Sequence, residues 1–302
     1  MKPSTPLRPG RPAAVIALIL LAAGSIALQA ARDRRYAPAA DEARLLYLRS
    51  GATVSRLALE YDALAADVYW IRAVLHYGGD RLNPRGEGRY ELLYPLLDLT
   101  TTLDPQFPIA YRFGAIFLAE QPPGGPGRVD LAEALLRKGM AASPERWQYP
   151  HDLGFLHYWQ QQDFKTAAMW FQHAATLPDA PEWLGPVAAG MLARGGERAA
   201  SRQLLTRILE SADQEWMRQT AIRWLRQLDA LDQMDQLDAM LAEYQRRAGR
   251  RPGTWVDVIR AGWLPGIPVD PAGHPYLLNA TWSTTRLSPE SPLNPLPEEL
   301  VR

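Results

Sequence analysis

Histidines and paired carboxylates are the side chains in this sequence that could perform acid–base or metal chemistry. The five histidines are His76, His151, His157, His173 and His274. None has the H-E-x-x-H spacing of a zinc site, and His151 and His157, six residues apart, would fall on different faces of a helix. Asp232 and Asp235 lie in a stretch rich in Gln and Asp, which is typical of a solvated helix face. We therefore expect no metal site at these residues.

Motifs of the common enzyme classes are not found in the sequence. It contains no G-x-S-x-G, no phosphate-binding G-x-x-x-x-G-K and no dinucleotide-binding G-x-G-x-x-G after a strand. The chain has no cysteine, which excludes disulfides, a cysteine nucleophile, thiolate metal ligands and lipid attachment through cysteine. We predict a non-enzymatic protein with no catalytic residues and no cofactor. The alternative is an enzyme whose scattered site residues converge only in the fold.

Charge is distributed unevenly along a chain whose formal net charge is zero. Residues 1–35 contain six basic residues and one acidic residue, which gives +5, and the remaining 27 basic and 32 acidic residues give −5. A nucleic-acid-binding protein would instead cluster Lys and Arg on one face. The mildly acidic body therefore argues against nucleic acid. A hydrophobic content of 47%, with 10 Trp and 12 Tyr, favours a folded core.

The N-terminus has the pattern of a membrane anchor. A basic segment, 1–12, precedes an uncharged run at 13–31, whose 19 residues are close to the ~20 that cross a bilayer core as a helix. A cleaved signal peptide is the alternative. However, the run is long for a signal peptide, and Leu28 lies near the best cleavage site, after Ala30, where a small residue is preferred. We therefore expect residues 13–31 to form a transmembrane helix.

Basic residues on both sides of this run determine its expected orientation. Three precede it and three follow it, so the excess of positive charge that marks the cytoplasmic side nearly cancels. No acidic residue precedes the run, which favours a cytoplasmic N-terminus. The expected location is a bacterial inner membrane, crossed once, with the body of the protein in the periplasm.

Two amphipathic helices are expected next, the first over 57–75 and the second over 92–103. Apolar residues of the first step by four and three, at Leu57, Tyr61, Leu64, Val68, Ile71 and Leu75. Gly78 and Gly79 are expected to end this helix. We predict that its apolar stripe is buried and that the helix caps the helix pairs that follow. A dedicated binding role is the alternative.

Two consecutive segments repeat one pattern of small and large residues. The first follows Leu103-Asp104-Pro105, with pattern residues Tyr111, Gly114, Ala115, Leu118, Ala132, Leu136, Gly139 and Pro144. The second, from 147 to 179, contains Leu153, Gly154, His157, Tyr158, Ala167, Phe171, Ala174 and Pro178. Both segments resemble the tetratricopeptide repeat, a helix–turn–helix unit of ~34 residues. The loop QPPGGPG, at 121–127, lengthens the turn of the first.

This resemblance implies an all-α fold, an α-solenoid of helix pairs over 41–249 behind the N-terminal transmembrane helix. In the family, small residues let the two helices of a unit approach closely, a role that falls here to Gly154, Ala167 and Ala174. A third unit would place apolar residues at Leu184, Val187, Ala188, Met191, Ala200 and Leu204. A fourth, degenerate helix pair is expected over 222–244.

The family binds its ligands on the surface lined by the first helix of each unit. Carried over to this chain, that surface comprises Arg112, Ile116, Gln148, His151, Phe155, Tyr158 and Trp159. Exposed aromatic side chains beside a cation suit an apolar helix or an extended peptide, with Arg112 available for a carboxylate. The expected partner is therefore a protein. Two alternatives are a lipid or small ligand in a closed pocket, and burial of Phe155 and Trp159 against the N-terminal helix.

The C-terminal segment, 250–302, is rich in Pro and Gly and is expected to form a small, irregular or β tail. A short helix, a turn and a strand should precede a proline-rich end that is extended or mobile. The sequence DPAGHPY, at 270–276, resembles the DP-x-G-x-PY turn of the major pseudopilins of type II secretion. A turn-stabilised tail on the last helix is the alternative. The resemblance favours a scaffold for assembly or export of a cell-envelope structure, such as a pilus or secretion system.

Overall fold

A computed structural model describes residues 19–28, 31, 60–82, 90–279, 281 and 284–297. The chain forms two units, Met1–Arg49 and Ser50–Arg302. In the first unit residues 19–28 are helical, and the rest of the expected anchor, apart from Ala31, lies outside the described residues. Within the described ranges, no helix combines the length and the apolar character needed to cross a membrane.

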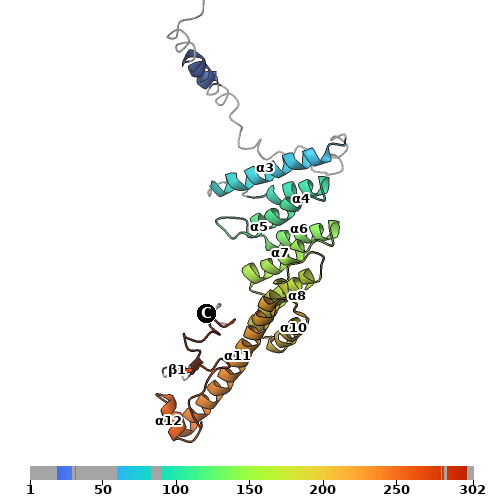
Figure 1. Ribbon diagram of the computed structural model, residues 1–302. Helices are drawn as coiled ribbons and strands as arrows, with labels where there is room; N and C mark the ends of the chain where they lie inside the picture. The colour runs from blue at the N-terminus through green and yellow to red at the C-terminus, as the bar shows by residue number, and fades with distance from the viewer. Residues whose placement is uncertain are drawn as a thin grey trace, which may run out of the picture. The chain divides into compact units, whose positions relative to one another are not determined.

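The described part of the second unit is mostly helical, which confirms the expected all-α class. Its helices are α3 (Asp62–Leu82), α4 (Leu93–Leu103), α5 (Pro108–Ala119), α6 (Val129–Ala142), α7 (Gln148–Leu156) continued by the π-helical turn η2 (His157–Gln161), α8 (Phe164–Ala175), α9 (Leu184–Arg194), α10 (Arg198–Ser211), α11 (Glu215–Ala248) and α12 (Trp255–Arg260). From α3 to α11 each helix packs against the next, so neighbours in sequence are neighbours in space (Figure 1).

Small residues allow α4, α5 and α6 to pack closely. Helix α5 begins at Pro108, whose fixed φ suits the first turn of a helix. A Cβ on Gly114 of α5 would lie 2.8 Å from the side chain of Leu97 in α4 and 2.9 Å from that of Leu135 in α6, so a larger residue there would have to displace these leucines. The predicted helices of this region are confirmed, and 121–127 forms the expected loop between α5 and α6.

The second predicted helix pair, α7 and α8, is also confirmed. Gly154, Ala167 and Ala174 are buried, as the pattern requires. A Cβ on Gly154 would lie 3.0 Å from the ring of Phe171 and 3.1 Å from the carbonyl oxygen of Ala167. The two helices therefore approach closely at Gly154, because glycine has no side chain to hold them apart.

We expect Gly154→Val to lower the free energy of unfolding by about 1–3 kcal/mol, because the added methyl groups must displace the Phe171 ring or the α8 backbone. The matched control is Gly79→Val in α3, where no atom lies within 4 Å of the added Cβ. Urea unfolding of the two variants measures the difference. Equal stabilities would show that α7 and α8 do not meet at Gly154.

Helix α3 differs from its prediction in both length and buried face. It continues through Gly78 and Gly79 to Leu82, because packing of its last turns outweighs the ~1 kcal/mol cost of an interior glycine. The buried residues are instead Ala66, Tyr69, Ala73 and Tyr77. The predicted stripe is exposed at Tyr61, Leu64, Val68, Ile71 and Leu75, and Leu57 lies outside the described residues. Burial of this stripe was therefore a wrong prediction.

The expected fourth helix pair is a single helix of 34 residues, α11. No Gly or Pro occurs between Glu215 and Ala248, so the sequence contains nothing that would stop the helix. Gly249, with φ 67°, ends it in the left-handed conformation that glycine adopts readily. Helix α11 packs on α10 and also carries the C-terminal tail.

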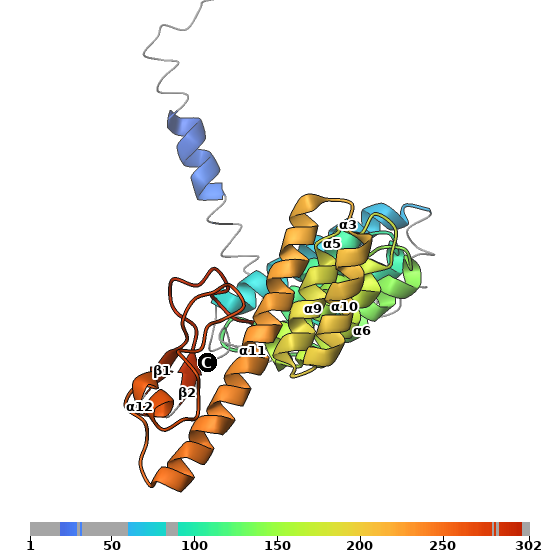
Figure 2. The same ribbon diagram turned by 60° about the horizontal axis from the view of Figure 1, so that its bottom comes forward.

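The tail folds against α11 as a turn and a short antiparallel hairpin (Figure 2). Asp270 is buried, and its carboxylate accepts hydrogen bonds from the amides of Ala272 and His274, at 2.8 and 2.9 Å. The hydroxyl of Ser291 donates to the same carboxylate at 2.5 Å. The hairpin pairs β1 (Leu277–Asn279) with β2 (Thr284–Arg286). The expected turn and strand are thus present.

The proline-rich end is packed rather than extended or mobile over its described part, 287–297, so that prediction was wrong. Leu293 and Leu296 are buried in the cluster formed with α11. The side-chain amide of Gln227, itself buried in α11, donates to the carbonyls of Leu293 and Pro295, at 2.7 and 3.0 Å. Leucines between the prolines supply apolar area, and Gln227 donates to carbonyls that this irregular, proline-rich segment does not pair within itself.

Candidate binding groove

A groove of about 540 Å³ lies between α5 and the α7–η2 segment. Five residues expected at a binding surface line it: Arg112, Ile116, His151, Phe155 and Trp159. Small and aliphatic residues from three helices complete the lining, among them Ala115, Leu136 and Leu156, which are buried. The groove is therefore apolar at its base and is formed by side chains from separate helix pairs.

The wall of the groove on the α7–η2 side is aromatic and exposed. Phe155 and Trp159 stack with ring centroids 6.2 Å apart and planes 5° from parallel. Their side chains remain 48% and 63% exposed, and Ile116 on the α5 side is 57% exposed. Neither Phe155 nor Trp159 is therefore buried against a described helix of the second unit. Isolated exposed apolar residues are normal, but three that converge on one hollow indicate a binding surface.

Arg112 forms an ion pair within the chain that the sequence did not suggest. Its Nε and Nη2 donate to the two carboxylate oxygens of Asp152, at 2.5 and 3.1 Å. A ring nitrogen of His151 lies 2.8 Å from the same carboxylate. The hydrogen bonds that Arg112 donates to Asp152 raise the pKa of its guanidinium above the usual value. The expectation of a cation available for a ligand carboxylate was wrong, because Asp152 already neutralises it.

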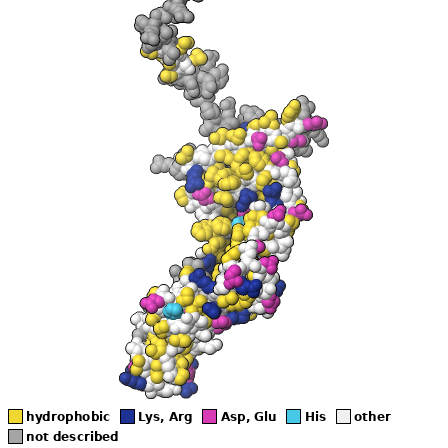
Figure 3. Space-filling view, in the orientation of Figure 1, with side chains coloured by type: hydrophobic (Ala, Val, Ile, Leu, Met, Phe, Trp, Pro, Cys, Tyr) yellow, Lys and Arg dark blue, Asp and Glu magenta, His cyan; other side chains and the backbone are white. Residues whose placement is uncertain are grey.

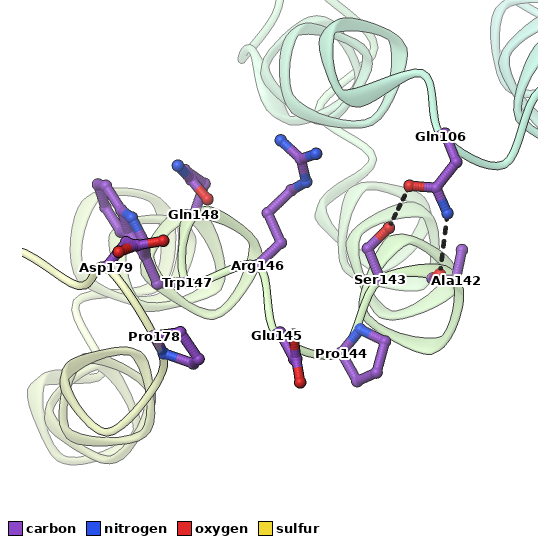
Figure 4. A pocket seen from close by; sticks show the side chains of 10 residues that line it. All are labelled: Gln106, Ala142, Ser143, Pro144, Glu145, Arg146, Trp147, Gln148, Pro178 and Asp179. Atoms are coloured by element: carbon purple, nitrogen blue, oxygen red, sulfur yellow. Dashed lines mark hydrogen bonds between the residues drawn. The ribbon is translucent and has the colours of Figure 1, made fainter.

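Two of the expected surface residues lie elsewhere. Gln148 lines a polar hollow of about 510 Å³ at the ends of the helix pairs, together with Gln106 and Arg146 (Figure 4). Tyr158 packs beside Phe164, and its hydroxyl accepts a hydrogen bond from Arg194 of α9 at 3.1 Å. Only one side of η2 therefore faces the groove.

The other end of the groove contains an acidic residue that the sequence did not single out. Glu120, which follows α5, accepts hydrogen bonds from the hydroxyl of Tyr77 and, at 3.0 Å, from Arg81. Arg81 also donates to the Tyr77 hydroxyl at 2.9 Å. Burial, and then the hydrogen bond to Glu120, raise the pKa of Tyr77 to about 12. This cluster anchors α3 beside the groove.

We expect Tyr77 to make stability fall at alkaline pH. Because its folded-state pKa is raised, its contribution is complete below the ordinary value of 10 and is lost between about pH 10 and 12. Unfolding free energies of the wild type should therefore fall more steeply over this range than those of Tyr77→Phe. Tyr61→Phe, which alters an exposed tyrosine just before the same helix, should follow the wild type. If the unfolding free energies of the wild type and Tyr77→Phe fell in parallel between about pH 10 and 12, the raised pKa of Tyr77 would be contradicted.

Several polar groups outside the groove join neighbouring helices or turns. Asp232 and Asp235 pair with Arg198 of α10, at 3.1 and 2.5 Å, and so join α10 to α11. His157 is buried and its Nδ1 lies 2.9 Å from the Gln161 side chain, within one turn of η2. Among the described residues no three His, Asp or Glu side chains converge as a metal site would require.

Comparison with known proteins yields no match to a family, to a curated protein or to a solved structure. The groove combines apolar walls and a buried base with two ionic clusters, one around Arg112 and one around Glu120. Figure 3 shows that hydrophobic side chains also gather on the surface of α3 and the helices next to it. These surfaces suit an apolar ligand.

Proposed function

We propose that this chain is a membrane-anchored scaffold of tetratricopeptide-like helix pairs that binds an apolar segment of a protein partner in the groove. The observation that carries the proposal is the stacked pair of Phe155 and Trp159, which stays exposed on the groove wall. Aromatic side chains of this kind dominate the binding energy of protein interfaces when a partner covers them. An apolar helix or an extended peptide could cover Phe155 and Trp159 in this way.

The order of packing supports the helical-repeat part of the proposal. Helices α5–α6 and α7–α8 form successive pairs with buried small residues at equivalent places, such as Gly114 in α5 and Gly154 in α7. First helices of adjacent pairs, α5 and α7, then supply the two walls of the groove. This is the arrangement expected when an α-solenoid binds its ligand on one face.

Exposure of the groove walls favours a protein segment over a lipid or small ligand. Pockets for small molecules bury most of the ligand, roughly 70–90% of its surface, between converging walls. Here Ile116 and Trp159 remain more than half exposed on opposite sides of the hollow. A longer partner that continues beyond the hollow would bury these side chains better than a compact ligand.

Two stretches of the sequence support a cellular role in the bacterial envelope. The uncharged run at 13–31 supports anchoring in a bacterial inner membrane with the body in the periplasm. The DPAGHPY turn supports a role in assembling or exporting an envelope structure such as a pilus or a secretion system. In both cases the partner would be a protein with an apolar segment.

Photo-crosslinking in native membranes tests the proposal. Replacing Trp159 of the full chain with a photoreactive phenylalanine should give covalent adducts that mass spectrometry maps to an apolar protein segment. The control position is Met169 of α8, which has the same exposed fraction, 63%, and lies outside the groove lining. Adducts to lipid alone would favour the ligand-binding alternative, and equal protein adducts at both positions would refute the groove.

A further inference from the structure

Helix α3 has two apolar faces, and only one of them packs against other helices that the structure describes. Its buried face, from Ala66 to Tyr77, packs against α4, and Trp70 and Tyr77 stack on Phe117 of α5. The other face carries the exposed stripe Tyr61, Leu64, Val68, Ile71 and Leu75. Each of these side chains is about half exposed or more, from 48% for Val68 to 69% for Tyr61 and Leu75.

The spacing of this exposed stripe is that of a coiled-coil seam. Its residues alternate steps of three and four over two heptads, with Tyr61, Val68 and Leu75 at a positions and Leu64 and Ile71 at d positions. A seam of two heptads would be too short to fold two helices alone. Helix α3 is already formed by packing on α4, so pairing along the seam would not have to supply the cost of helix formation.

The two ends of the helical stack differ in whether other described residues cover the outer face of the terminal helix. At the C-terminal end the tail covers α11, and Tyr276 and Leu296 fill the surface that would otherwise be open. Helix α3 is the first helix of the stack in the described part of the second unit, and its outward stripe is apolar. Terminal elements of helical stacks normally present a polar outer face, because an apolar one promotes association.

We propose that the exposed stripe of α3 is the interface with a second copy of this chain, paired as a parallel two-stranded coiled coil. In a parallel pair the residue before each a position faces, across the interface, the residue five places later in the partner helix. That rule sets exposed Asp67 opposite Arg72 of the partner subunit, twice in a symmetric dimer. Opposite charges there select the parallel register.

An antiparallel pair does not gain this complementarity. In that arrangement Asp67 would flank positions such as Val74, and Arg72 would flank Ala65 or another Arg72. A parallel pair also starts both α3 helices at the same end, which suits two chains anchored in one bilayer. Only this last point depends on the proposed function; the seam and its charges stand without it.

The absence of native cysteine makes disulfide crosslinking of the full chain a clean test. In a parallel dimer equal positions face each other, so oxidation should crosslink Val68→Cys to itself and Ile71→Cys to itself. The control is Ala63→Cys, an exposed position on α3 away from the seam. We expect at least tenfold more crosslinked dimer from either seam variant than from the control. All three substitutions are small changes at exposed sites, and circular dichroism verifies the fold.

Two results would overturn this inference. Crosslinking only when the Val68→Cys and Ile71→Cys chains are mixed would show an antiparallel pair, in which those two positions face each other. No excess over Ala63→Cys, together with a monomer mass for the wild-type chain in detergent, would show that no second copy binds α3. A dimer mass that Val68→Asp reduces to a monomer would add independent support.

Discussion

Replacing both Phe155 and Trp159 with alanine should weaken capture of the protein partner by roughly thirtyfold or more, since one buried aromatic anchor at an interface is worth ~2 kcal/mol or more. Stability should change little, because both side chains are already about half exposed or more. The double variant loses their mutual stacking, worth about 0.5–1.5 kcal/mol. That loss corresponds to a fall of only a few degrees in the thermal midpoint, at about 2–4 °C per kcal/mol for a domain of this size.

Co-purification from membranes and a thermal melt of the same preparation measure both quantities. Met169→Ala removes a side chain of equal exposed fraction on α8 and should change neither. Unchanged capture by the double variant would show that the partner binds elsewhere. A fall of more than about 10 °C in the thermal midpoint would show instead that the aromatic pair is part of the core.

Tyr276→Ala should be among the most destabilising single substitutions in the tail, at about 3–5 kcal/mol. The side chain is 1% exposed within the apolar cluster that joins the tail to α11, and its hydroxyl donates to Gln233 at 2.8 Å. Burial raises the pKa of the Tyr276 hydroxyl, so the neutral, hydrogen-bonded form is the one that fits there. Removing the ring leaves a cavity under β1 and β2.

Urea unfolding and hydrogen exchange separate the tail from the rest of the fold. Tyr276→Phe keeps the ring and loses only the hydroxyl, so it should cost about 1 kcal/mol. In Tyr276→Ala, amides of α12 and the hairpin should exchange faster, whereas those of α5 to α8 should keep their protection. A loss below 1 kcal/mol for Tyr276→Ala would contradict the packing of the tail on α11.

Local patterns predicted the central helices well, because close packing there depends on small residues at fixed spacing. Gly114 and Gly154 are such residues, and a Cβ at either one would crowd the helix opposite. Helix α11 was predicted less well, because periodicity marks a helical face but only Gly or Pro marks a break. The sequence from 215 to 248 contains neither.

Helix α3 shows a limit of reading burial from periodicity. Two apolar faces run along it, one through Ala66 and Tyr69 and one through Leu64 and Val68. The second is more hydrophobic in sequence, yet the first is buried, because small residues let α3 approach α4. A pattern within one helix does not state which face its neighbour covers.

The groove was predicted in part for a related reason. Phe155 and Trp159 are four residues apart, so their shared face follows from helix geometry alone. The pairing of Arg112 with Asp152, forty residues later, depends on the packing of α5 against α7. Glu120 and Tyr77 likewise meet only in the folded chain. Long-range pairs of this kind carry no local sequence signal.

Thiol labelling in native membranes tests most directly whether a partner occupies the groove. Trp159→Cys and Met169→Cys each place a single thiol at a position that is 63% exposed in the isolated chain. Both should react rapidly in the purified protein. In membranes we expect Trp159→Cys to react at least tenfold more slowly while Met169→Cys keeps its rate. Equal, rapid labelling of Trp159→Cys in both preparations would show that the groove stays empty, and would contradict the proposed function.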